Sequence, residues 1–149
     1  MTIRGIVENG KHLGRTLGFP TANIRPDPSA PELPANGVYA AAFWVEGDPV
    51  ARMCMLNQGR HPTAPEGKPT IEAYVLDYDG DLYGRRVKVE YLRFLRPEKR
   101  FESLEALTEQ LRHDRDDVRA WFDSARKEAS RASEIFGPKN MPAPPTCFQ

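Results

Sequence analysis

Five stretches of the chain have the β-branched, aromatic and apolar content of β-strands, and the last of them alternates apolar with polar residues. They are residues 3–8, 37–45, 50–58, 71–78 and 86–95. Each is followed by a turn or by a loop rich in glycine, proline or charged residues. Strands joined in this way predict an antiparallel barrel or sandwich. Residues 25–36 carry four prolines, so we expect a long ordered loop there, neither helix nor central strand.

The hydrophobic period becomes helical after the last of these stretches. Ser103 is the expected N-cap, and apolar residues then recur at helical spacing, which predicts one helix or two from about residue 103 to about residue 132. Asp114 falls on this apolar stripe, where a charge needs a partner. Two interpretations stay open: Asp114 is a kink or cap residue, or it faces a site. Residues 133–149 are expected to form a flexible tail.

Composition narrows the class of protein. A chain of 149 residues predicts one domain with a core of its own. Lysine and arginine are balanced by aspartate and glutamate, so we expect no nucleic-acid partner. We also expect no membrane partner, because no apolar run is long enough to span a bilayer, and the N-terminus lacks a signal-peptide core. The two cysteines, Cys54 and Cys147, predict reduced thiols and a cytoplasmic protein.

Several common motifs are absent from the sequence. Residues 77–84, DYDGDLYG, resemble a calcium loop, but the glycine falls at the fourth position and the twelfth residue is Lys88, which excludes EF-hand geometry. The chain has neither a Walker A loop nor a dinucleotide-binding glycine motif. Its three histidines lack metal-ligand spacing with the cysteines.

The segment GRTLGFPTANI, residues 14–24, is a candidate phosphate and metal site. Gly10, Gly14 and the glycine at position 18 allow backbone N–H groups to approach an anion, and Arg15 adds a positive charge. Thr21 and Asn23 offer neutral oxygens that suit Mg²⁺, and in an extended chain they point to the same side. The alternative is that both side chains only satisfy backbone groups in a turn.

Two further features carry candidate chemistry. Glu72 lies in an otherwise apolar strand, where it is either solvated or held for proton transfer. In the segment FLRPEKRFESLEAL, residues 94–107, Arg96, Lys99 and Phe101 could hold a flat and partly anionic ligand. The alternative for this segment is a plain strand-to-helix connection with solvated charges.

Together these features resemble the riboflavin kinase (flavokinase) family. The resemblance covers about residues 3–117, and the order of the Pro-Thr-Ala-Asn motif, the glutamate strand and the Arg-Pro-Glu segment makes it specific. It implies a mainly β fold, a six-stranded antiparallel Greek-key barrel with a C-terminal helix, over residues 1–132. It also implies transfer of the γ-phosphate of ATP to the 5′-hydroxyl of riboflavin, giving FMN and ADP. The alternative is a barrel that binds flavin or nucleotide without catalysis.

The resemblance also implies a role for each matching residue. Glu72 corresponds to the catalytic base, and Thr21 and Asn23 correspond to the residues that hold Mg²⁺, or another divalent cation, with the nucleotide. The implied phosphate- and ATP-binding residues are Gly10, Gly14, Arg15, Thr21 and Tyr83. The implied flavin-binding residues are Arg96, Lys99 and Phe101.

The sequence departs from the family in two respects. His12 and Leu13 stand where the phosphate flap often carries a glycine and a basic residue. The adenylyltransferase module of bifunctional relatives is not in this chain, so we expect a stand-alone kinase or a single domain of a larger protein. A monomer is expected.

Overall fold

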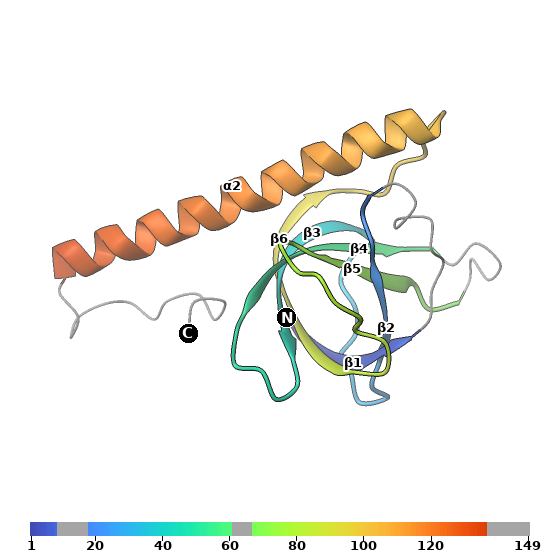
Figure 1. The fold of residues 1–149 in the computed structure, drawn as a ribbon, viewed down its shortest axis with the longest axis horizontal. Helices are drawn as coiled ribbons and strands as arrows, with labels where there is room; N and C mark the ends of the chain where they lie inside the picture. Colours follow the sequence, from blue (N-terminus) through green and yellow to red (C-terminus); the bar gives the residue numbers. More distant parts are fainter. Residues whose placement is uncertain (9–17, 61–66, 137–149) are drawn as a thin grey trace.

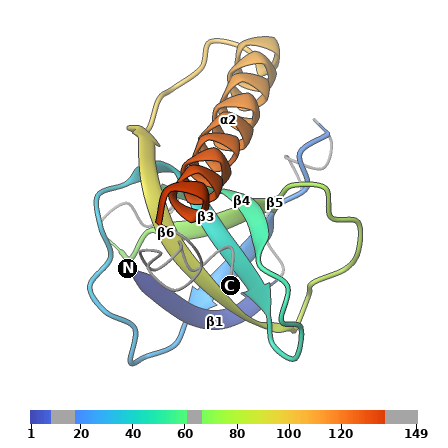
Figure 2. The same cartoon turned by 90° about the vertical axis from the view of Figure 1, so that its left-hand side faces the viewer.

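Six antiparallel strands close into a barrel, and one long helix lies across its outer surface (Figures 1 and 2). The structure is a computed structural model and describes residues 1–8, 18–60 and 67–136. The elements are β1 (Thr2–Glu8), β2 (Ala22–Pro26), β3 (Gly37–Val45), β4 (Arg52–Gly59), β5 (Thr70–Val75), β6 (Arg86–Arg96) and α2 (Leu104–Phe136).

The strand order confirms the Greek-key prediction. Around the barrel the strands follow the order β1-β2-β5-β4-β3-β6, in which β3, β4 and β5 are consecutive neighbours. Strand β6 returns to lie beside β3, which is the Greek-key connection. Since β1 pairs with both β2 and β6, the barrel is closed.

Alternate residues of every strand point into the barrel and form its core. On β5, for example, Ile71, Ala73 and Val75 are buried, whereas Glu72 and Tyr74 between them are partly exposed. This inward set supplies most of the apolar burial that holds the barrel closed. The side chains of the other set face the outside of the barrel, where α2 covers some of them.

Strand β2 differs from the sequence-based prediction, in which residues 25–36 were all loop. Arg25 and Pro26 instead complete β2, and Pro26 is its last residue, opposite Gly5 of β1. Proline is tolerated there because a strand end needs no further N–H donor in the ladder. The pairing of β2 with β5 is short and involves only Ala22 and Asn23.

The remaining proline-rich residues, 27–36, close one end of the barrel as an ordered loop. The Tyr39 hydroxyl donates to the Ala35 carbonyl over 2.5 Å, and the Gln58 side-chain amide donates to the Pro34 carbonyl over 2.7 Å. The Tyr91 hydroxyl donates to Gln58 Oε1 over 2.8 Å, so the fully buried Gln58 amide is satisfied at both ends.

One continuous helix, α2, follows the barrel, and it extends four residues beyond the predicted end at 132. Ser103 is the N-cap, as predicted, because its Oγ accepts from the Ala106 N–H over 3.1 Å. The apolar face of α2 packs on the outside of β3 and β4 through Val118 and Phe122. Figure 1 shows that the later turns extend past the barrel. No helix in the described residues is long and apolar enough to cross a membrane.

Candidate functional site

A row of four polar residues crosses the outer wall of the barrel on adjacent strands. Glu8 of β1 lies opposite Asn23 of β2, Asn23 lies opposite Glu72 of β5, and Glu72 lies opposite Asn57 of β4. Directly opposed residues of paired strands share a face and have Cβ atoms roughly 4.5–5.5 Å apart. The neighbours Val7, Ile24 and Ile71 are buried in the core, so the four polar side chains face outward.

Glu72 is the central acid of this polar row. It is partly exposed on the outer face of β5 and stands between the side chains of two asparagines. The amide groups of Asn23 and Asn57 can donate to a carboxylate or accept from a ligand. Asn23 and Glu72 are therefore direct cross-strand neighbours, although 49 positions separate them in the sequence.

The segment that leads into β2 is anchored by Phe19. Its ring is buried, lies 5.3 Å from the Tyr74 ring between centroids, and has the Arg115 guanidinium of α2 5.3 Å from its centroid. Gly18 has a φ of 84°, the left-handed region that favours glycine. Thr21 follows this anchor and precedes β2, so it is fixed one residue before the strand that carries Asn23.

A cavity of about 930 Å³ opens beside Asn23. It forms where β2 and β5 separate after their short pairing, and the 27–36 loop covers it from the other side. Its walls include Glu8, Asn23, Leu33, Asn36 and Gln58. Sequence reasoning missed this cavity, because it depends on how far two distant strands stay paired.

The turn that carries Tyr83 is attached to the end of β1, next to Glu8. The Gly84 N–H donates to the Val7 carbonyl over 2.9 Å, and the Val7 N–H donates to the Arg85 carbonyl over 3.0 Å. Tyr83 itself is 59% exposed. This residue is thus at the Glu8 end of the row, beside the point where residues 9–17 begin.

Arg96, Lys99 and Phe101 lie close to one another where β6 leads into α2. The cationic groups of Arg96 and Lys99 lie 5.8 and 5.7 Å from the centroid of the Phe101 ring. Both are within the range of a cation–π contact. The connection between β6 and α2, residues 97–103, is called the β6–α2 loop below.

Arg96 also supplies the partner that Asp114 requires. Its Nε lies 2.9 Å from Asp114 Oδ1, and its Nη2 lies 2.8 Å from Oδ2, a bidentate ion pair. The Gln110 side-chain amide donates to Oδ1 over 2.9 Å. Asp114 is 1% exposed, so the buried charge on α2 is neutralised by Arg96, one of the candidate flavin-binding residues.

Glu98 is a residue of the β6–α2 loop that sequence reasoning missed. Its carboxylate accepts from the Arg60 N–H over 2.9 Å and lies directly over Gly59. Gly59 follows Asn57 by two positions on β4, so this contact docks the loop beside the polar row. The only signal in the sequence was a glycine at the end of a strand, which indicates a close approach without naming the partner.

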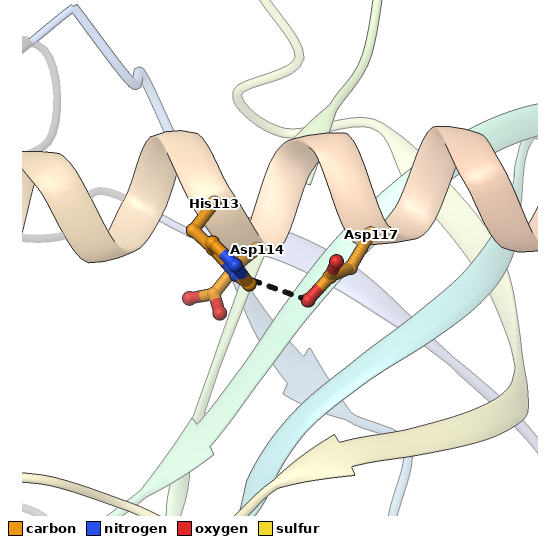
Figure 3. A group of neighbouring side chains, drawn as sticks. All are labelled: His113, Asp114 and Asp117. Carbon is orange, nitrogen blue, oxygen red and sulfur yellow. Dashed lines mark ion pairs between the residues drawn. The ribbon is translucent and has the colours of Figure 1, made fainter.

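His113, Asp114 and Asp117 form a group with ligand atoms within 4.8 Å of one another on α2 (Figure 3). His113 Nδ1 lies 3.2 Å from Asp117 Oδ2, and both residues are exposed. Asp114, however, already accepts from Arg96 and Gln110 through its carboxylate. We therefore assign this group no metal.

Gly10, Gly14 and Arg15, the predicted phosphate flap, lie outside the described residues, as do His12 and Leu13. Among the described residues, the structure brings Thr21, Asn23 and Glu72 to one wall, and it places Arg96 at the end of β6 and Lys99 and Phe101 on the β6–α2 loop. Their individual roles stay predictions.

The fold and the outward-facing polar row define a small closed β-barrel with a candidate site on its outer wall. The sequence profile of the riboflavin kinase (Flavokinase) family matches residues 1–122. The crystal structure of riboflavin kinase from Trypanosoma brucei superposes with a TM-score of 0.62 at 28% identity, covering 92% of this chain and 89% of that one. The chain belongs to the riboflavin kinase family.

Curated relatives extend beyond the region that they share with this chain. A bifunctional riboflavin kinase/FMN adenylyltransferase of Listeria monocytogenes is 38% identical over 122 residues, 81% of this chain and 38% of the relative. The RNA-binding riboflavin kinase RibR of Bacillus subtilis is 34% identical over 148 residues, 98% of this chain and 62% of that protein. The chain thus spans less than two thirds of either relative.

Proposed function

We propose that the protein transfers the γ-phosphate of ATP to the 5′-hydroxyl of riboflavin, forming FMN and ADP. Membership of the riboflavin kinase family supports the reaction class, and one observation supports the site. This observation is the direct cross-strand pairing of Glu72 with Asn23, which sets a carboxylate beside a neutral oxygen ligand. A proton acceptor and a phosphate-side ligand are the two groups that this transfer needs side by side.

The order of residues along the polar row supports an arrangement of the two substrates. Glu8 and the Tyr83 turn lie on one side of Asn23, which favours the nucleotide there. Asn57 and the docked β6–α2 loop lie on the other side of Glu72, which favours the flavin there. In this arrangement the γ-phosphate passes from the nucleotide to the flavin at the point where Asn23 and Glu72 lie side by side.

Thr21 and Asn23 fit a divalent cation, because a hydroxyl and an amide carbonyl are hard oxygen donors of the kind that Mg²⁺ binds. When bound, Mg²⁺ neutralises charge on the phosphate oxygens. The protein's own residues orient the acceptor. Glu72 accepts the proton of the ribityl hydroxyl while the hydroxyl oxygen bonds to the γ-phosphorus and ADP leaves. Arg96, Lys99 and Phe101 are proposed to bind the flavin, and Gly10, Gly14, Arg15 and Tyr83 are proposed to bind the nucleotide.

The test of this function is direct conversion followed by chromatography. The protein is mixed with riboflavin, ATP and Mg²⁺, and FMN is quantified with time, then with other nucleotides and metals. FMN formation is expected. Tight retention of riboflavin without conversion would instead establish a non-catalytic flavin-binding barrel and overturn the proposal.

Glu72→Gln tests the role of the base. The variant should bind riboflavin and ATP normally yet lose roughly 10²–10⁴-fold in kcat, the usual contribution of a general base. Glu90→Gln is the matched control, because Glu90 is a carboxylate on β6 that lies opposite Thr2 and Ala42 and away from the polar row. Near-normal turnover of Glu72→Gln would refute the assignment.

Other expectations about partners and location stay predictions. A monomer, the absence of a nucleic-acid partner and a cytoplasmic location rest on the sequence alone. Sedimentation and a filter-binding assay with RNA would test the first two.

A further inference from the structure

Asp114 is the most deeply buried charge in the described part of the chain, and the proposed reaction gives it no role. It sits on α2, and its carboxylate is held by three donors, two from Arg96 and one from Gln110. Arg96 is the last residue of β6, and the β6–α2 loop begins immediately after it. The ion pair therefore fixes the point at which this loop leaves the barrel.

The guanidinium of Arg96 is largely committed to this arrangement. Its Nε and Nη2 face Asp114, and its Nη1 donates to the carbonyl of Pro97, the next residue, over 3.2 Å. These bonds orient both the side chain and the first peptide of the loop. Arg96 is thus positioned to hold the loop, and its guanidinium carbon lies 5.8 Å from the centroid of the Phe101 ring.

The other attachment of the loop lies only two residues further on. Glu98 accepts from the Arg60 N–H on the β4 side, while Arg96 is tied to α2. Between them these two contacts fix residues 96–98, so the direction in which Lys99 and Phe101 project depends on both. If the α2 contact is lost, the Glu98 contact alone sets the loop.

We propose that Asp114 is a positioning residue that aligns the β6–α2 loop for the flavin by holding Arg96. The inference rests on the proposed function for its ligand, but the loop placement can be measured without any ligand. Asp114 itself is too deeply buried to be the ligand's partner, so it acts through Arg96.

Asp114→Asn is the central variant, because it keeps the size of the side chain and removes the charge. The riboflavin KM should rise about tenfold or more while kcat changes less than about threefold, as expected when a ground-state binding element is misplaced and the reacting groups are not. Arg96→Lys keeps the positive charge but cannot form the bidentate pair with Asp114, so it should also raise the riboflavin KM. The double variant should be no worse than Arg96→Lys alone, because Asp114 acts only through Arg96.

Tryptic cleavage after Lys99 and Arg100 provides the ligand-free measurement. Cleavage there, at a temperature at which the variants remain folded, should be about tenfold faster in Asp114→Asn than in the original protein. Gln110→Ala is a milder variant that removes one neutral donor and leaves the ion pair. It should give a smaller rise in both measurements, and it keeps the inference testable if Asp114→Asn fails to fold.

Asp77→Asn is the matched control. Asp77 forms another bidentate pair with α2, to Arg119 at 2.6 and 2.8 Å, but it lies in the loop between β5 and β6. The Asp77→Asn variant should leave the riboflavin KM and the cleavage after Lys99 unchanged.

The outcomes separate the two levels of inference. If the original protein makes no FMN but Asp114→Asn is cleaved faster, the proposed function fails and the positioning role stands. If FMN forms, and cleavage and riboflavin KM in both Asp114→Asn and Gln110→Ala equal those of the original protein, the positioning role is overturned. An equal effect of Asp77→Asn would also overturn it, because the change would then follow general loosening of α2.

Discussion

Replacing Gly59 by alanine should undo the second attachment of the β6–α2 loop while leaving the barrel intact. A Cβ at this position would lie 2.5 Å from Glu98 Oε1 and 3.4 Å from Glu98 Cδ. Since ordinary contacts of this kind begin near 3.4 Å, the carboxylate oxygen has to retreat by about 0.9 Å. The same oxygen accepts from the Arg60 N–H at 2.9 Å, so this retreat lengthens or breaks that bond.

Two opposing contributions set the expected free energy of unfolding. An exposed hydrogen bond of this type contributes roughly 1 kcal/mol, which Gly59→Ala would lose. Removing a glycine from a strand stabilises the folded state by roughly 0.5–1 kcal/mol through the entropy of the unfolded chain. The net stability of Gly59→Ala should therefore be close to that of the original protein. Its riboflavin KM should rise about fivefold, the factor that corresponds to roughly 1 kcal/mol.

The assay is a double-variant comparison with Glu98→Ala. In that background the clashing carboxylate is gone, so Gly59→Ala should raise the free energy of unfolding by roughly 0.5–1 kcal/mol and should not change the riboflavin KM further. Thermal or urea unfolding of the four proteins measures the first quantity, and initial rates of FMN formation measure the second. Strictly additive effects of the two substitutions on both quantities would refute the steric argument.

Two further predictions concern groups away from the polar row. Burial raises the pKa of the Cys54 thiol. In a Cys147→Ser background, the folded protein should therefore not react with a thiol reagent at pH 8, whereas the urea-unfolded protein should react at once. Rapid labelling of the folded form would contradict the buried placement of Cys54. The hydrogen bond from Arg119 lowers the pKa of Asp77 in the folded protein. The pair therefore stabilises the folded state fully at pH values above the unfolded-state pKa of about 3.9. This stabilisation is lost as the pH falls through the lower pKa of the folded state. Asp77→Asn should therefore flatten the acid side of the Tm–pH curve below about pH 4, and an unchanged curve would show that the pair does not form in solution.

The strands that the sequence predicted well are those with a strong local pattern. Residues 37–45 and 86–95 match β3 and β6 nearly end to end, because strand-forming residues and the turn residues that bound them act over a few positions. Strand β2 was missed because it is five residues long and ends in a proline, so its local signal favoured a loop. Its strand conformation depends on pairing with β1 and β5, which no local pattern encodes.

The candidate site shows the same limit: the sequence indicates which residue types matter, but not which residues contact one another. The sequence analysis selected Asn23, Glu72, Arg96 and Asp114 from their chemistry and local setting. It could not derive that Asn23 opposes Glu72, or that Arg96 holds Asp114, because strand register and helix placement are set by packing across the whole barrel. For this reason the partner of Asp114, Arg96 at the end of β6, was known only from the structure.

Two turns of α2 hold three separate segments around the barrel. Asp114 holds Arg96 at the end of β6, Arg115 lies over Phe19 before β2, and Arg119 holds Asp77 after β5. Because residues 114, 115 and 119 belong to one rigid helix, the three attached segments are fixed relative to one another as well as to the barrel. A shift of α2 would displace the Thr21 side and the Phe101 side of the proposed site together. The separation of the two substrates in the proposed site thus depends on how α2 sits on β3 and β4, as well as on the residues that would touch them.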